Sequence, residues 1–247
     1  MHGSMLIALV LTLAAVIPAR AADLQVIAGG GIAVPLNEIA AQFELTSGHK
    51  ITIRYGTAPE LIGIAKTTPF DLAVTPSEVF RDDGAAARLL PGPTIDIARV
   101  GLGVAVRAGA PKPDIATPDA LKQALLSAKT VGTIPASAAG AQVMKLFEAL
   151  GVANEVKAKL QAAANPTKLI ESVAGGQAEL GVFLINVLTT NGLDVVGPVP
   201  AELDQKLVYT SGIARDAVQA GIARAFLDYL KSPPATAILK ARGLAPG

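Results

Sequence analysis

Leu24-Gln25-Val26-Ile27-Ala28-Gly29-Gly30-Gly31 is the stretch that decides the fold class, because an apolar run of strand-forming residues leads directly into three glycines. A helical pattern follows, in which Leu36, Ile39, Ala40 and Phe43 recur at a spacing that places them on one helix face. A strand, a glycine-rich loop and an amphipathic helix in this order form the first unit of an α/β sheet.

The same order of elements recurs along most of the chain. Apolar or alternating runs predict strands over residues 51–55, 70–74, 100–106, 130–134 and 180–184. Capping residues and helical periodicity predict helices from Pro59, Thr117 and Asn165, over residues 143–150 and 154–160, and twice between residues 222 and 242. The alternation predicts an α/β protein with mostly parallel sheets flanked by helices.

The chain changes character at residues 107–113, which are rich in proline and follow the apolar run over residues 100–106. This change favours two lobes, the second of which is inserted into the first. We expect residues 22–104 and 208–247 to form lobe 1 and residues 105–207 to form lobe 2.

The first 21 residues have the pattern of an export signal. Residues 5–18 are apolar but shorter than the about 20 residues that a membrane-spanning helix needs. Ala19-Arg20-Ala21 fits cleavage between small residues, although residues 1–4 lack the usual Lys or Arg. An uncut anchor or a buried helix is the alternative. We expect cleavage near Ala21 and a periplasmic product.

Composition excludes several functions. The chain has no cysteine, which excludes disulfides, thiol nucleophiles and cysteine-ligated zinc. Loss of Arg20 with the signal brings Lys plus Arg, 21 in the full chain, level with the 20 Asp plus Glu, so the basic excess of a nucleic-acid-binding protein is missing. His49 is the only histidine after the signal, and a solvated turn position explains it better than a Ser-His-Asp triad or a multi-histidine metal site. We expect no metal and no cofactor.

Four segments share a design that suits anions, because small and polar residues lead into the start of a helix. Helix starts expose unpaired N–H groups at the positive end of the helix dipole. In open α/β sheets such loops meet at the carboxyl ends of the strands. Helix capping explains each loop alone, but four of them in a two-lobed chain favour a small anion held in a cleft. They are residues 29–35, 56–60, 135–141 and 165–168.

Three stretches together resemble the periplasmic molybdate-binding proteins of ABC importers, and the resemblance covers nearly the whole mature chain. It rests on residues 22–50 with Ser47-Gly48-His49-Lys50, on Pro69-Phe70-Asp71-Leu72-Ala73-Val74, and on Phe226-Leu227-Asp228-Tyr229-Leu230. The resemblance implies the type II periplasmic binding fold, with two crossing strands between the lobes and hinge closure on the ligand. It also implies an inner-membrane ABC permease as partner; we expect the protein itself to be a monomer.

The resemblance places the ligand contacts as well. The family binds its oxyanion with hydroxyl groups and backbone amides, but its two loop serines fall on Gly31 and Ala58 and its closing tyrosine on Leu184. A buried dianion needs its donors, so these replacements favour a larger organic di- or tricarboxylate over molybdate or tungstate. A receptor for molybdate or tungstate stays an alternative. The candidate ligand-binding positions are Gly30, Gly31, Thr57, Ala58, Arg99, Ser137, Ala139, Gly140, Thr167 and Leu184.

Two arginines, Arg54 and Arg99, are expected near the cleft or hinge. A guanidinium there can hold a carboxylate by two hydrogen bonds, although an ordinary surface ion pair is the better explanation of each arginine taken alone.

Residues 96–101 and 108–114 resemble the aconitate isomerases of the same family, which move a double bond by proton transfer. That chemistry needs an acid or base in the cleft, and Glu60 or Tyr55 is the candidate, although Glu60 also suits the helix dipole. An importer receptor is therefore the leading function, an isomerase the second, and a structural or adhesive domain the third.

Overall fold

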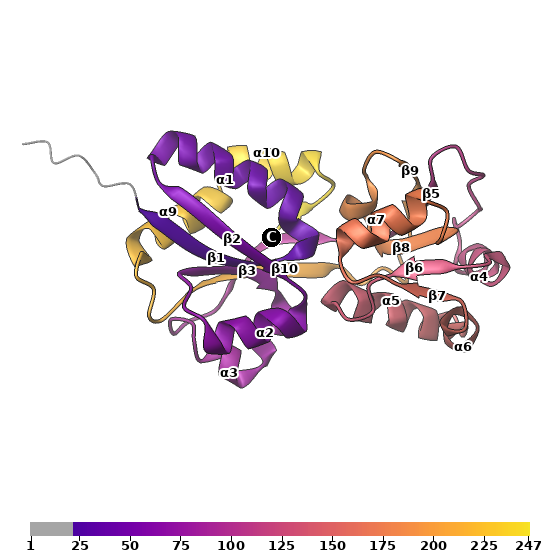
Figure 1. Cartoon of the computed structure of the whole chain (residues 1–247), viewed down its shortest axis with the longest axis horizontal. Coiled ribbons are helices and arrows are strands. Elements are labelled where there is room, and N and C mark those ends of the chain that lie inside the picture. Colours follow the sequence, from indigo (N-terminus) through magenta and orange to yellow (C-terminus); the bar gives the residue numbers. More distant parts are fainter. Residues whose placement is uncertain (1–21) are drawn as a thin grey trace, which may run out of the picture.

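The computed structural model describes residues 22–247, so the expected export signal and its cleavage site at Ala21 lie outside the described residues. Two bodies, each built on one β-sheet, lie side by side and are joined by extended segments (Figure 1). We call the body on the first sheet lobe 1 and the body on the second sheet lobe 2. The first sheet has the order β11 (Ala245–Pro246), β4 (Ile95–Val100), β10 (Leu207–Ile213), β3 (Leu72–Pro76), β1 (Asp23–Gly29) and β2 (Lys50–Gly56). The second has the order β7 (Leu160–Ala162), β6 (Val131–Thr133), β8 (Leu180–Leu184), β5 (Leu102–Arg107) and β9 (Leu193–Pro198).

The α/β class is confirmed, but both sheets are mixed rather than mostly parallel. In lobe 1, β1 pairs parallel with β2 and β3, whereas β10 pairs antiparallel with both β3 and β4. In lobe 2, β6 pairs parallel with β7 and β8, whereas β5 pairs antiparallel with β8 and β9. The antiparallel pairs arise because the chain that crosses between the lobes enters each sheet against the direction of its neighbours.

The single strand expected over residues 100–106 is wrong, because it is two strands in different sheets. β4 ends at Val100 in lobe 1 and β5 begins at Leu102 in lobe 2, with Gly101 between them. The chain returns between β9 and β10, where a carboxylate oxygen of Asp204 accepts a hydrogen bond from the Leu102 N–H at 3.0 Å. Lys206 forms an ion pair with the same side chain. The two crossings are therefore tied together, while the lobe boundaries at residues 104/105 and 207/208 stay predictions.

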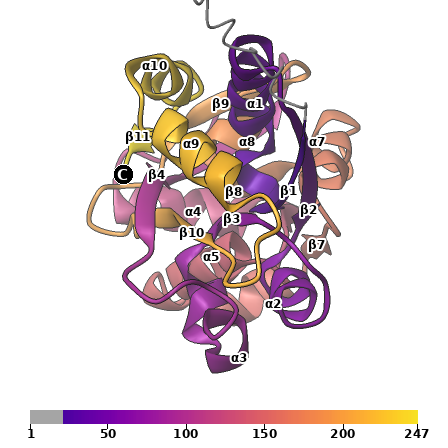
Figure 2. The same cartoon turned by 90° about the vertical axis from the view of Figure 1, so that its left-hand side faces the viewer.

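Strand β1 is buried on both faces, and alternation along it assigns each face a helix layer. Leu24, Val26 and Ala28 pack in the core that contains α1 (Ala33–Ser47), whereas Ile27 packs with Leu61 of α2 (Ala58–Thr67). The helices α9 (Ala220–Leu230) and α10 (Pro233–Ala241) lie beside α1. The segments α3 (Asp83–Ala86) and η2 (Ser77–Arg81) lie beside α2, on the other face (Figures 1 and 2).

Lobe 2 surrounds its smaller sheet with five helices, of which the first, second and fourth begin after the capping residues Thr117, Ser137 and Asn165. They are α4 (Pro118–Ser127), α5 (Ala138–Ala149), α6 (Ala153–Lys157), α7 (Pro166–Ala174) and α8 (Ile185–Leu188). The helix expected over residues 154–160 is too long, because Leu160 opposite Val131 begins β7. The long-range strand pairing overrides the local helical pattern there. No helix within residues 22–247 is both long and apolar enough to span a bilayer.

Phe226 tests the packing of the helix layer of lobe 1. Its ring is fully buried, with its centroid 5.1 Å from that of Phe43. Phe226→Ala should lower the free energy of unfolding by about 3–5 kcal/mol, because it removes a large side chain and leaves a cavity. Urea unfolding followed by circular dichroism measures the change. Leu45→Ala on α1, where the side chain is 87% exposed, should cost less than about 0.5 kcal/mol. Equal losses in both variants would contradict this packing.

Candidate functional site

A cleft of about 820 Å³ lies between the lobes, which is within the range of small-molecule sites. It is lined by the segments that follow β1 and β2 in lobe 1 and β6, β7 and β8 in lobe 2. The lobes approach closely at Gly30, where an added Cβ atom would lie 3.7 Å from Pro166 Cδ. The cleft therefore sits where the carboxyl ends of parallel strands meet, as open α/β sheets require.

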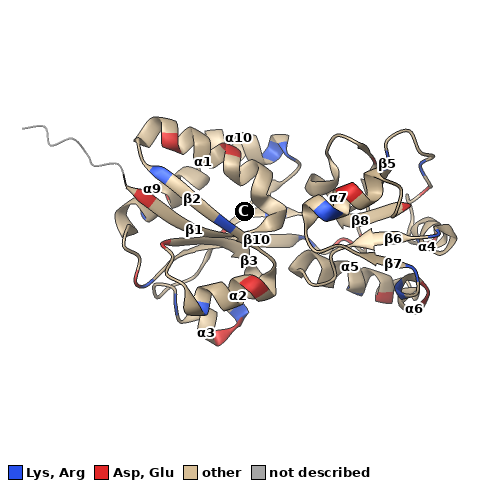
Figure 3. Ribbon diagram, in the orientation of Figure 1, with Lys and Arg blue, Asp and Glu red and all other residues tan. Residues whose placement is uncertain are grey.

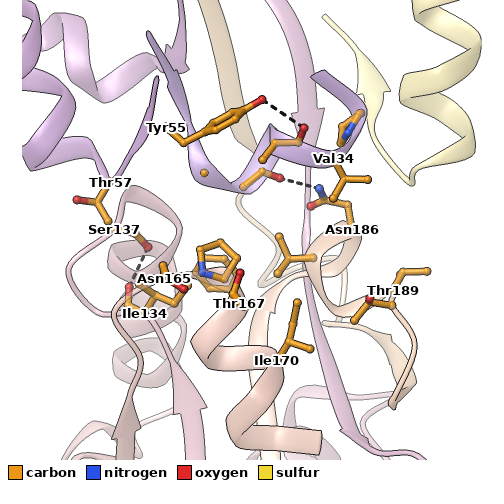
Figure 4. Close-up of a pocket in the computed structure, with 18 of the residues that line it drawn as sticks. Val34, Tyr55, Thr57, Ile134, Ser137, Asn165, Thr167, Ile170, Asn186 and Thr189 are labelled. Carbon is orange, nitrogen blue, oxygen red and sulfur yellow. Dashed lines mark hydrogen bonds between the residues drawn. The ribbon is translucent and has the colours of Figure 1, made fainter. Parts of the chain in front are cut away.

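Most of the predicted contact residues gather here. Gly30, Gly31, Thr57, Ser137 and Thr167 line the cleft, as do the two candidate catalytic residues, Tyr55 and Glu60. A recess of about 30 Å³ opens beside it and is lined by several of the same residues, with Ala58, Ala139 and Leu184 added. Figure 4 shows Thr57 and Ser137 at one end of the cleft, on opposite lobes.

Three predicted positions lie elsewhere. Arg99 is exposed on β4 and pairs with Asp96 at 2.9 Å, and it lines neither the cleft nor the recess. Arg54, on β2, does not line the cleft or the recess either. For Arg99, the structure shows the surface ion pair that was the alternative to a ligand contact. Gly140 packs inside the first turn of α5, where an added Cβ atom would overlap the carbonyl oxygen of Ile134. It shapes the loop rather than lining the site.

Tyr209 lines the recess, although the sequence did not predict it as a site residue. A Cβ atom at Gly31 would overlap the Tyr209 hydroxyl and lie 2.6 Å from Leu184 Cδ1. A Cβ atom at Gly29 would lie 2.9 Å from Tyr209 Cε1. The space in which a serine side chain at position 31 would begin is therefore occupied. Burial raises the pKa of Tyr209, so its hydroxyl keeps its proton at neutral pH and is available as a donor.

The helix starts around the cleft are capped by their own side chains. The Ser137 hydroxyl accepts a hydrogen bond from the Gly140 N–H at 2.9 Å, and Asn165 Oδ1 accepts one from the Lys168 N–H at 3.0 Å. Capping leaves the N–H groups of Ala138 and Ala139, which line the recess, without an intrahelical partner. The anion-binding capacity of α5 thus lies in these backbone groups more than in the Ser137 hydroxyl.

Glu60 serves the start of α2. One of its oxygens accepts hydrogen bonds from the Thr57 N–H at 2.7 Å and from the Thr57 hydroxyl at 2.9 Å. These bonds, the backbone one first, lower the pKa of Glu60 below its ordinary value of 4.5. The ionised Glu60 therefore stabilises the fold at pH values above 4.5, and this contribution is lost as the pH falls through the lowered pKa.

Tyr55 is held in a similar way. Its hydroxyl donates to Asn37 Oδ1 at 2.7 Å, and burial raises the pKa of Tyr55. At neutral pH, Glu60 is an engaged carboxylate and Tyr55 a protonated phenol, so neither is tuned as a general base. Within residues 22–247 no three His, Asp or Glu side chains gather in a way that could hold a metal ion.

Two further cleft residues depend on contacts that the sequence does not reveal. Asn186, on α8, donates from Nδ2 to the Gly31 carbonyl at 2.8 Å and so links lobe 2 to lobe 1. Arg242 follows α10, and its Nε and Nη2 lie 3.1 and 2.9 Å from Glu38 Oε2. Among the described residues that line the cleft, Arg242 is the only cation and Glu60 the only anion. Other charges are scattered over both lobes in the view of Figure 3.

Two α/β lobes, a double crossing between them and a cleft faced by helix starts define a solute-binding protein. Residues 24–245 match the family described as "Bacterial extracellular solute-binding protein", and the chain belongs to this family. The resemblance seen in the sequence is thereby confirmed.

The similar proteins differ in what their names say of them. The chain is 30% identical over 232 residues to an aconitate isomerase from a Pseudomonas species, with 90% of this chain and 87% of that protein covered. It is 30% identical over 236 residues to the molybdate-binding protein ModA of Azotobacter vinelandii, with 91% and 90% covered.

Solved structures share the fold. The periplasmic molybdate-binding protein of Azotobacter vinelandii superposes with a TM-score of 0.76 at 21% identity, covering 90% of this chain and 98% of that one. PEB3 with bound L-phospholactate gives a TM-score of 0.70 at 14% identity, covering 90% and 99%. The type II periplasmic binding fold is therefore confirmed.

Gly140 tests the tight first turn of α5. Gly140→Ala should lower the free energy of unfolding by about 1–3 kcal/mol, because the new methyl group has to displace the Ile134 carbonyl. Gly63→Ala is the matched control, since a Cβ atom on Gly63 of α2 meets nothing within 4 Å and should stabilise the helix by about 0.5–1 kcal/mol. Urea unfolding measures both. A neutral Gly140→Ala would mean that this turn has more room than the structure shows.

Proposed function

We propose that this chain is an exported receptor that binds a small organic carboxylate in the interlobe cleft and delivers it to an ABC permease. Membership of the solute-binding family supports the receptor role. The export pattern in residues 1–21 supports delivery across the periplasm. The chemistry of the cleft supports the class of ligand.

One observation carries the choice of an organic anion over a compact oxyanion. The Tyr209 hydroxyl and Leu184 occupy the space beside Gly31, and the recess there holds only about 30 Å³. A tetrahedral oxyanion has to exchange its whole hydration shell for donors placed around it, and a buried dianion with missing donors is costly. The cleft of about 820 Å³ beside the recess instead leaves room for the carbon skeleton of an organic carboxylate.

An aconitate isomerase is the second candidate, and the relative from Pseudomonas with 30% identity is the observation that favours it. Proton transfer would need Glu60 or Tyr55 to act on the ligand. The lowered pKa of Glu60 makes its carboxylate a weak base near neutral pH. The raised pKa of Tyr55 makes its hydroxyl a weak acid there. Binding without conversion is therefore the better-supported activity.

A melting screen tests the receptor proposal. Carboxylates should raise the melting temperature, because a ligand at 100 times its dissociation constant adds about 2.7 kcal/mol to stability. Molybdate and tungstate should leave it unchanged. Thr167→Val should reduce the carboxylate shift, since Thr167 lines the cleft, whereas Thr46→Val on the outer surface of α1 should not. A shift with molybdate or tungstate alone would contradict the proposed ligand class.

NMR of trans-aconitate with the purified protein separates receptor from isomerase. We expect the trans-aconitate signals to persist and no cis-aconitate to accumulate. Turnover would favour the second candidate, and Tyr55→Phe and Glu60→Gln would then show which group moves the proton. A turnover that survives both substitutions would exclude the two candidate residues as well.

A further inference from the structure

We infer that the preferred ligand is a linear aliphatic dicarboxylate, with one carboxylate at the helix starts, the methylene chain across an apolar strip, and the other carboxylate on Arg242. This inference rests on the proposed function, because it concerns the same cleft, and it narrows the ligand within the carboxylates.

One end of the cleft offers neutral donors to an anion. Thr57 of lobe 1 and Ser137 of lobe 2 lie at this end (Figure 4), where their hydroxyl groups donate to Glu60 and to the Ile134 carbonyl. The donors left for an anion are in the neighbouring recess, which the protonated Tyr209 hydroxyl lines. Ala138 and Ala139 line the same recess, and their N–H groups in the first turn of α5 have no intrahelical partner. A carboxylate has only two oxygens to satisfy, so it needs fewer donors than a tetrahedral dianion.

The middle of the cleft is apolar on both lobes. Val34 at the start of α1 lines the cleft and is 63% exposed. Ile170 of α7 and Val187 of α8 line the cleft from lobe 2, and Figure 4 shows Ile170 between Thr167 and Thr189. We refer to Val34, Ile170 and Val187 as the apolar strip. Methylene groups laid along this strip would remove its surface from water, which is favourable.

The far end of the cleft carries the cation. Arg242 lines it, and the adjacent Gly243 lies against α8, since an added Cβ atom on Gly243 would be 4.0 Å from Asn186 Cβ. Thr189, which follows α8, lies at the opposite end of Figure 4 from Thr57 and Ser137, and the yellow C-terminal segment runs on that side. The two polar ends are thus separated by the apolar strip.

Arg242 has capacity for a ligand despite its ion pair. Its contacts with Glu38 use Nε and Nη2, and within residues 22–247 its Nη1 makes no hydrogen bond. The side chains of Arg242 and Glu38 are 50% and 40% exposed, and ion pairs that exposed are weak and easily shared. A carboxylate arriving from the cleft can therefore bind the free edge of the guanidinium.

The same arrangement disfavours a branched tricarboxylate. A third carboxylate attached to the middle of the ligand would lie against the apolar strip, where a charged group loses water without gaining a partner. The described residues that line the cleft offer this third carboxylate no second cation, because Arg242 is the only cation among them. Of the di- and tricarboxylates expected from the sequence, the structure favours the linear dicarboxylates.

Calorimetric titration with succinate, adipate, hexanoate and trans-aconitate tests the inference. Adipate should bind more tightly than succinate, because its methylene chain can span the apolar strip. It should also bind more tightly than hexanoate, which has the same chain but one carboxylate. Arg242→Gln should weaken adipate binding by about tenfold or more, as expected for one lost charge-assisted hydrogen bond, and change hexanoate binding by less than about twofold.

Lys240→Gln is the matched control, because it removes the same charge from an exposed position on α10 that does not line the cleft. It should leave every affinity unchanged, and unaltered hexanoate binding shows that the Arg242→Gln variant is folded. Equal weakening of adipate and hexanoate, or tighter binding of trans-aconitate than of adipate, would overturn the inference while leaving the receptor role intact. Failure of every carboxylate to bind would instead overturn the proposed function itself.

Discussion

The ring of Tyr209 lies against the backbone of Gly29 and Gly31, and the rest of the site depends on this contact. Neither glycine has room for a side chain, since an added methyl group would meet the tyrosine in both cases. Tyr209 belongs to β10, the strand by which the chain returns from lobe 2. A residue of the returning strand thus lines the small recess, and the large cleft lies beside it.

The position of Tyr209 changes the interpretation of the glycine at position 31, where the molybdate-binding family is expected to have serine. By the resemblance alone, glycine there is a lost hydroxyl and a wider pocket. In the structure the hydroxyl is supplied by Tyr209 from another strand, and the pocket is narrower at that point. The proposed carboxylate ligand would therefore lie outside this recess, toward the apolar strip and Arg242.

Much of the fold could be predicted because it rests on local patterns. Alternating apolar residues mark β1, and capping residues such as Thr57, Ser137 and Asn165 mark helix starts that the structure brings to one cleft. The wrong predictions share a cause, because the elements concerned depend on pairing with residues far along the chain. The apolar run over residues 100–106 was expected to be one strand, but Val100 ends a strand of one sheet and Leu102 begins a strand of the other. Leu160 was expected in a helix, but it pairs with Val131.

The sequence by itself determined the α/β class, the likeness to solute-binding proteins and the helix starts at the site, because short-range periodicity and capping encode all three. Only the tertiary structure decided which side chains meet in the cleft. Tyr209, Asn186 and Arg242 reach it through contacts with residues far along the chain, while Arg99 turns outward to Asp96. These contacts depend on how the chain crosses between the two sheets at Gly101 and near Asp204, and no local sequence pattern predicts that geometry.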